Sequence, residues 1–284
     1  MAETKISSMK KEVIIGHGLP TVLIGERINP AGKKKMADAL RAGDLDIVCA
    51  EAISQVAAGA DIIDVTVGTF GVDEIDLLPK AVKAIMKAVN TPLCFDSPKP
   101  EALEAALKVY QGKALINSVN GEEKSLNYVL PLVKEYKAAV IGLTQDEHGI
   151  PADPDKRLAI AQKIVDRAEK MGIPREEIII DCLASSIGAD QNSGLVTLET
   201  IKKVKETLGV NITLGASNVS FGMPGRDRIN NAFISAAILA GSTCLIVDAS
   251  KIRPAVLATD FILGQDQRAM RYTQDYRTRK QVKE

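Results

Sequence analysis

Eight short and nearly continuous apolar runs recur along the chain, and longer stretches with a helical repeat of apolar positions separate them. An apolar run without alternation is typical of a strand that is covered on both faces, as in a parallel sheet. We therefore predict eight parallel strands. They lie at residues 21–27, 61–67, 91–96, 113–117, 138–143, 177–183, 211–217 and 242–248.

The segments between these runs are typical of amphipathic helices, since several begin at Asp, Ser or Pro and end near Gly. Alternating strands and helices imply right-handed crossovers and a parallel sheet. Eight such units within about 250 residues favour a closed TIM barrel, (β/α)8, and no GxGxxG turn follows the first strand. We predict an α/β fold with a single domain over residues 1–284, a barrel core at about 20–265 and a polar C-terminal helix or tail at 266–284.

Polar side chains stand at the C-terminal end of almost every predicted strand, where the catalytic groups of such barrels collect. Asp and Asn are also ordinary caps and turn residues, so Asp64 and Asp248 are equally suited to bonding loop amides or bracing Arg27. Their joint occurrence at so many strand ends predicts a polar pocket. The set comprises Glu26, Arg27, Asn29, Asp64, Thr66, Asp96, Ser97, Asn117, Ser118, Asn120, Thr144, Gln145, Asp146, Asp181, Ser217, Asn218 and Asp248.

Asp, Asn and Asp on neighbouring strands suit a planar heterocycle with an amino-pyrimidinone edge. A carboxylate accepts from N–H donors, while an amide both donates and accepts. Clustered carboxylates also bind metals, but no histidine ligand accompanies these, and we expect no metal site in this chain. The loop at 221–228, "FGMPGRDR", offers free amides at the start of a helix and is a candidate phosphate site.

The composition argues against several classes of partner. The formal net charge is +0 and the pI is near 6.8, so no basic field favours nucleic acid or an anionic membrane. No apolar run has the length of a membrane span, and the N-terminal stretch lacks the pattern of a signal peptide. Four widely spaced cysteines without a CxxC pair argue against a disulfide framework. We expect a cytoplasmic protein.

Seven motifs follow one another along roughly residues 20–265: "IGERINP", "IDVTVG", "CFDS", "LINSVNGE", "IGLTQDEHGIP", "IIDCL" and "GASNVSFGMPGR". In this order they resemble the pterin-binding methyltransferase family. That family includes the methyltetrahydrofolate:corrinoid methyltransferases and the folate module of cobalamin-dependent methionine synthase. Each motif alone is weak, but the ordered set is specific.

The resemblance implies roles for particular side chains. Asp96, Asn117 and Asp181 would hold the pterin ring by hydrogen bonds. Asn218 would be a mobile side chain that swings in to contact pterin N5 during methyl transfer, while Asp96 and water extend a network that delivers a proton. Residues that match the surrounding pocket are Ser217, Ile141, Gly142 and Arg226.

Two positions depart from the pattern of the family. Thr66 stands where the methyltransferases carry Asn in "D-x-N-x-G", so a polar contact there is expected to change. Pro98 follows "CFDS" and is expected to reshape that loop.

The implied activity is methyl transfer between N5 of 5-methyltetrahydrofolate and the cobalt of a corrinoid, in either direction. N5 is a poor leaving group, so activation requires proton or hydrogen-bond donation toward it, which an amide such as Asn218 gives without becoming charged. No segment resembles a cobalamin-binding "DxHxxG" module. We therefore expect cobalamin on a partner corrinoid protein within a multi-component system, and the family resemblance suggests a homodimer.

Two other functions stay open. A dihydropteroate synthase resembles this chain in its Asp-Asn-Asp pterin contacts, but its lysine-bearing loop and terminal Arg-x-His pair are not evident here. A non-catalytic folate-binding subunit would present its ligand without turnover. Arg226 and Arg228 are equally open, between the benzoyl-glutamate side of folate, the corrinoid protein and a salt bridge at the helix start.

Overall fold

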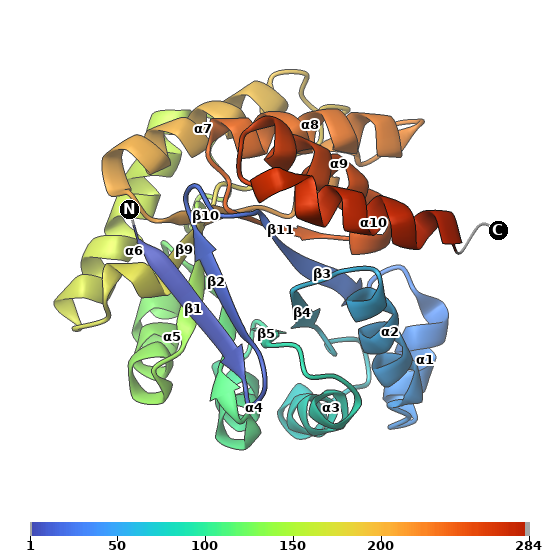
Figure 1. The fold of residues 1–284 in the computed structure, drawn as a ribbon. Helices are drawn as coiled ribbons and strands as arrows, with labels where there is room; N and C mark the ends of the chain where they lie inside the picture. The colour runs from blue at the N-terminus through green and yellow to red at the C-terminus, as the bar shows by residue number, and fades with distance from the viewer. Residues whose placement is uncertain (1, 282–284) are drawn as a thin grey trace.

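The computed structural model describes residues 2–281, which form a ring of parallel strands surrounded by helices (Figure 1). The strands of the ring are β3 (Val22–Ile28), β4 (Ile62–Val65), β5 (Leu93–Asp96), β7 (Leu115–Asn120), β8 (Ala139–Leu143), β9 (Ile178–Asp181), β10 (Asn211–Thr213) and β11 (Cys244–Val247). They pair in the order β10-β9-β8-β7-β5-β4-β3-β11. Hydrogen bonds from Thr243 N to Ile212 O (2.9 Å) and from Ile246 N to Leu214 O (3.0 Å) join the two end strands. The predicted TIM-barrel fold is confirmed.

The barrel strands serve two cores at once, which explains why their sequences are apolar without alternation. Ile24 and Ile62 pair in register and pack among the side chains inside the barrel. Their neighbours Leu23 and Ile63 belong instead to the larger cluster between the sheet and the helices. Each strand therefore buries successive residues on opposite faces.

The helices cover the outside of the ring (Figure 1). Start signals in the sequence act as expected at α3 and α6, where Asp73 and Asp153 accept hydrogen bonds from the backbone N–H groups of Ile75 and Asp155. The helices are α1 (Lys34–Arg41), α2 (Asp46–Ala57), α3 (Glu74–Ala88), α4 (Pro100–Val109), α5 (Glu123–Tyr136), α6 (Pro154–Lys170), α7 (Ser193–Leu208), α8 (Arg226–Ala240), α9 (Ala249–Ile262) and α10 (Met270–Gln281). Short 3-10 turns are η1 (Arg175–Glu177), η2 (Ala216–Ser220) and η3 (Gln267–Ala269).

A small antiparallel sheet, which the sequence pattern did not predict, covers the N-terminal end of the barrel. It consists of β1 (Glu3–Ser8), β2 (Glu12–Gly16) and β6 (Gly112–Lys113), and β1 and β2 lie across the ring in Figure 1. Ile6, Val13 and Ile15 are buried among the inward-facing side chains of the barrel strands. The interior is thus sealed by apolar side chains at this end, which leaves the opposite end for polar chemistry.

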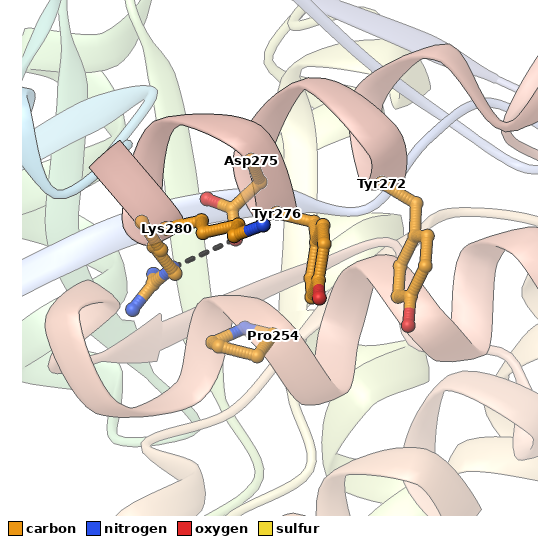
Figure 2. Close-up of a pocket in the computed structure, with 6 residues that line it drawn as sticks. Pro254, Tyr272, Asp275, Tyr276 and Lys280 are labelled. Carbon is orange, nitrogen blue, oxygen red and sulfur yellow. Dashed lines mark hydrogen bonds and ion pairs between the residues drawn. The ribbon is translucent and has the colours of Figure 1, made fainter. Parts of the chain in front are cut away.

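Helix α10 packs beside α9 on the outside of the barrel (Figure 1). Arg253 of α9 donates from Nε to Asp275 of α10 over 2.9 Å. A surface pocket of about 320 Å³ opens between the two helices, and Figure 2 shows Tyr272 and Tyr276 pointing from α10 toward α9. None of the residues predicted for the site lies in this pocket.

Candidate functional site

The C-terminal ends of β4, β5 and β7 bring Asp64, Asp96 and Asn117 together in the mouth of the barrel. Asp96 and Asn117 are paired in the register of adjacent strands, and Asn117 Nδ2 donates to Asp64 Oδ1 over 3.4 Å. Thr66 Oγ1 donates to Asp96 Oδ2 over 2.6 Å. The structure thus places the predicted Asp96 and Asn117 in one polar cluster and adds Asp64 as a partner. Thr66, the residue that departs from the family pattern, makes its polar contact with Asp96.

Burial raises the pKa of both carboxyl groups in this cluster. Desolvation, with the neighbouring charge of Asp96, raises the pKa of Asp64 to about 8. Burial also raises the pKa of Asp96, while the Thr66 hydroxyl lowers it and the charge of Glu74 raises it. Two carboxyl groups this close in a desolvated place do not readily ionise together. The cluster therefore retains a proton near neutral pH.

Asp181 is buried at the end of β9. Burial raises its pKa to about 7, against the lowering effect of the backbone N–H groups of Leu183 and Gly215 and of the charge of Arg157. Leu183 N donates to Asp181 Oδ1 over 2.7 Å. Asp181 is therefore a titrating acceptor that connects the β9 wall of the mouth to the residues that follow β10.

A pocket of about 720 Å³ opens beside the cluster, at the ends of β5, β7 and β8. Asp96 and Asn117 are among its lining residues, whereas Asp181, Ser217 and Asn218 are not. Strand order places β10 across the ring from β5, so Ser217 and Asn218 lie at the far side of the mouth. A volume of this size accommodates a bicyclic ring with polar contacts.

Asn218 lies in the η2 turn after β10 and is exposed. Its side-chain amide has no hydrogen-bond partner among residues 2–281. The amide nitrogen sits 3.1 Å from the point that a Cβ on Gly215 would occupy, so the glycine leaves room for this rotamer. Beside it, Ser217 Oγ donates to Glu26 Oε1 over 3.2 Å. The predicted contact with N5 requires a side-chain amide that is free to turn toward the ligand, and Asn218 has such an amide. The contact itself stays a prediction.

Comparison with known families matches residues 25–248 to the family described as pterin binding enzymes. The chain belongs to this family. The matched range starts in β3 and ends just after β11, so it spans the barrel of the pterin-binding enzyme. The resemblance that the motifs predict is confirmed.

Curated relatives of this pterin-binding enzyme are methyltransferases. The chain is 32% identical over 264 residues to a methylcorrinoid:tetrahydrofolate methyltransferase of Eubacterium limosum, covering 90% of this chain and 96% of that protein. It is 32% identical over 266 residues to a methionine synthase of Mycobacterium leprae, covering 89% of this chain and 22% of that protein. The similarity therefore extends over nearly all of the first relative and over one segment of the second.

Solved structures share the barrel. A Yersinia pestis dihydropteroate synthase with a pterine-sulfa conjugate superposes with a TM-score of 0.70 at 15% identity, covering 92% of this chain and 100% of that one. A Clostridium difficile dihydropteroate synthase with pteroic acid gives 0.72 at 23% identity, covering 87% and 98%. At such identities these likenesses show the fold alone.

Arg226 braces the turn that carries Asn218 in this pterin-binding enzyme. Its Nη2 donates to Ser217 O over 2.8 Å and its Nε to Ser220 Oγ over 3.0 Å. The guanidinium carbon lies 5.9 Å from the ring centre of Phe221. Positioning this turn is a role that sequence reasoning did not consider for Arg226, and its predicted contact with the pterin stays a prediction.

Ile141 and Gly142 occupy opposite faces of β8. Ile141 is fully buried among the side chains inside the barrel and is paired in register with Asn117. A Cβ on Gly142 would lie 3.1 Å from Ile164 of α6 and 3.1 Å from Ile180, so this glycine permits close packing of the helix layer. The structure explains Gly142 by packing, and contacts of both residues with a pterin stay predictions.

The interpretation of Asp248 as a structural residue is correct. Asp248 Oδ2 accepts from Arg27 Nη1 over 3.1 Å, and its Oδ1 caps α9 by accepting from Ser250 N over 3.1 Å. Glu51 holds the other side of the guanidinium with both of its oxygens. Asp64 has a different environment, since it accepts from Asn117 in the mouth and does not contact Arg27.

Sequence reasoning missed Glu74, which reaches the mouth from the start of α3 and is buried. Its Oε2 accepts from Ser97 Oγ over 2.7 Å, and its Oε1 lies 3.2 Å from Lys99 Nζ. These contacts hold the segment that follows Asp96. An acidic residue in the first turn of a helix is common, because it interacts favourably with the helix dipole. The sequence around Glu74 therefore does not indicate that its side chain reaches the mouth of the barrel.

Among residues 2–281, no group of three His, Cys, Asp or Glu side chains is placed to hold a metal ion. No helix formed by the described residues is long and apolar enough to cross a membrane.

Proposed function

We propose that this pterin-binding enzyme moves a methyl group between N5 of 5-methyltetrahydrofolate and the cobalt of a corrinoid protein, in either direction, as one component of a multi-component system. Similarity to a methylcorrinoid:tetrahydrofolate methyltransferase over 96% of its length supports the proposal. The observation that carries it is the mouth itself. Asp96 and Asn117 line a pocket on one side, and Asn218 offers an unengaged amide across the ring.

The pterin ring would be held by its amino-pyrimidinone edge. Asp96 and Asp181 would accept from its N–H groups, and Asn117 would donate to one ring atom and accept from another. Burial raises the pKa of both carboxyl groups, that of Asp181 to about 7, so Asp181 is partly protonated at neutral pH before the ligand arrives. The N–H donors of the ring favour the carboxylate form, so folate binding at neutral pH would release protons.

Asn218 would donate toward N5 as the bond to the methyl group weakens. An amide stabilises the electron density that N5 gains without changing its own charge. Arg226 keeps the turn in place through Ser217 O and Ser220 Oγ. The corrinoid of the partner supplies cobalt(I), a strong nucleophile, at the open end of the barrel. The chain itself orients the folate, shields the ring and places a donor at the departing nitrogen.

Two alternatives lack an observation that favours them. Likeness to dihydropteroate synthases is 15% and 23% in sequence and shows the fold alone. A folate-binding subunit without turnover would use the same pocket, so only an assay separates it from an enzyme. The named methyltransferase relatives weigh toward turnover.

The test is a spectroscopic transfer assay with purified protein. 5-Methyltetrahydrofolate and free cob(I)alamin should give the spectrum of methylcobalamin, and methylcobalamin with tetrahydrofolate should give the reverse change. Calorimetry with 5-methyltetrahydrofolate measures binding in the same preparation. Binding without exchange in either direction would support the folate-binding subunit, and absence of both would contradict any folate function.

The homodimer and the cytoplasmic location belong to the same proposal. Sedimentation at several protein concentrations would measure the first. Fractionation of producing cells with an antibody to the chain would measure the second.

A further inference from the structure

One half-buried carboxyl group in the mouth, that of Glu26, has no part in the proposed transfer as described so far. Glu26 stands near the end of β3, which neighbours β11 in the ring. Its Oε1 accepts from Ser217 Oγ over 3.2 Å, and Ser217 directly precedes Asn218. Glu26 is therefore the carboxyl group linked to the turn that would contact N5.

The charged groups near Glu26 belong to three parts of the barrel. Asp248 follows the neighbouring strand β11, Asp64 stands on β4, and Lys33 lies in the loop after β3. Burial raises the pKa of Glu26 and outweighs the lowering effects of the Ser217 hydroxyl, of the charge of Lys33 and of the backbone N–H of Asp248, while the charge of Asp248 raises it further. The carboxyl group can therefore hold a proton at a higher pH than an exposed glutamate does.

The nearby cations are engaged elsewhere. Lys33 Nζ donates to the backbone oxygen of Arg27 over 2.7 Å. Arg27 directs its side chain to Glu51 and Asp248. No salt bridge to Glu26 is found among residues 2–281, so no ion pair fixes it as a carboxylate.

We propose that Glu26 is the source of the proton that N5 takes up during methyl transfer to cobalt, with the Ser217 hydroxyl as the relay. The proposal rests on the function proposed above. The hydrogen bond between the two side chains can run in either direction. A protonated Glu26 donates to Ser217 Oγ, and the hydroxyl hydrogen of Ser217 then points toward the space that Asn218 borders.

The bond between N5 and the methyl carbon breaks, and N5 keeps the bonding electron pair. The methyl carbon forms a bond with cobalt(I), which supplies both electrons of that bond. N5 takes a proton from Ser217 Oγ, which takes one from Glu26, and Glu26 is left as a carboxylate. In the reverse direction the Glu26 carboxylate recovers the proton by the same route.

The other carboxyl groups of the mouth are poorly placed for this role. Asp64 and Asp96 lie in the cluster with Asn117 across the ring from β10. Asp181 reaches the start of this turn through the backbone N–H of Gly215, but in the proposed complex its carboxylate accepts from the ring. Glu26 is half-buried, and its carboxyl group bonds the side chain of Ser217, the residue before Asn218.

The decisive experiment compares Glu26→Gln with wild type in single-turnover transfer from saturating 5-methyltetrahydrofolate to free cob(I)alamin between pH 5.5 and 8.5. The wild-type rate should fall at alkaline pH as Glu26 loses its proton. Glu26→Gln should be about 100-fold slower at pH 6.5 and should lose that alkaline limb, as expected for removal of a proton donor. Folate affinity by calorimetry should change less than about threefold. Glu51→Gln, a nearby carboxylate bound to Arg27, should keep the wild-type profile.

A second variant keeps the proposal testable if Glu26→Gln folds poorly by circular dichroism. Ser217→Ala removes the relay between Glu26 and N5, so the rate should fall about tenfold and the alkaline decrease that depends on Glu26 should be lost. The proton route would be overturned if the transfer rate of Ser217→Ala, or of a folded Glu26→Gln, decreased at alkaline pH in the same way as that of wild type. Normal wild-type transfer in that case would leave the proposed function standing, whereas no wild-type transfer would overturn both.

Discussion

Asp64 is the carboxyl group whose burial should weigh most on the stability of the fold near neutral pH. It is 4% exposed, and its pKa is about 8 against an ordinary value of 3.8. Between these values the native protein keeps a proton that the unfolded chain has released. Because the folded pKa is the higher one, the free energy of unfolding falls as pH rises through this window. Asp64→Asn abolishes the titration and keeps an oxygen that can accept from Asn117.

The size of the effect follows from proton linkage. One proton of difference lowers the free energy of unfolding by about 1.4 kcal/mol per pH unit. From pH 4.5 to 7.5, wild type should lose about 4 kcal/mol through Asp64 that Asp64→Asn retains. Other buried carboxyl groups with a raised pKa, such as Asp181 and Asp260, titrate in both proteins and cancel in the comparison.

Urea unfolding followed by circular dichroism at both pH values measures this directly. The stability of Asp64→Asn relative to wild type should rise by several kcal/mol from the acidic to the neutral condition, whatever constant offset the amide introduces. Asp46→Asn, at an exposed position in the first turn of α2, should run parallel to wild type. A difference between Asp64→Asn and wild type that is equal at both pH values would refute the burial argument.

Three further outcomes are expected. Wild-type affinity for 5-methyltetrahydrofolate, measured by calorimetry, should increase from pH 6 to pH 8, because Asp181 has a pKa of about 7 and accepts from the ring as a carboxylate. Asp181→Asn should bind the folate at least about tenfold more weakly, and its affinity should not depend on pH in this way. Thr66→Val removes a donor that lowers the pKa of Asp96, so the folate KM at pH 7 should rise about fivefold, with Thr66→Ser close to wild type. Gly142→Val should lower the free energy of unfolding, measured in urea, by about 2 kcal/mol, because the valine side chain would meet α6. An unchanged affinity, KM or free energy of unfolding in the respective variant would contradict the contact on which that prediction rests.

The architecture was predictable because the parallel strands are apolar on both faces. The predicted run at 61–67 overlaps β4, and each of the other seven runs likewise overlaps one barrel strand. The seal formed by β1 and β2 was not predicted. Ile6, Val13 and Ile15 alternate with exposed residues, as in any half-buried hairpin, and nothing local says that this hairpin covers the barrel.

The candidate site was predictable only where its residues end strands. Asp96 and Asn117 follow from strand positions, since parallel strands present their C-terminal ends together. The bond between Asn117 and Asp64 spans β5, which lies between their strands, so it depends on the curvature of the closed barrel. Glu74 enters from a helix start, and its place beside Ser97 is set by tertiary packing alone.

The central claim is that the mouth of this barrel transfers a methyl group with the help of the Asn218 amide. Single-turnover exchange between 5-methyltetrahydrofolate and free cob(I)alamin, measured beside folate binding for wild type and Asn218→Ala, tests it most directly. We predict transfer by wild type, and for Asn218→Ala a loss of about 100-fold or more in rate with most of the binding retained. Wild-type binding without transfer, or equal rates for the two proteins, would contradict the claim.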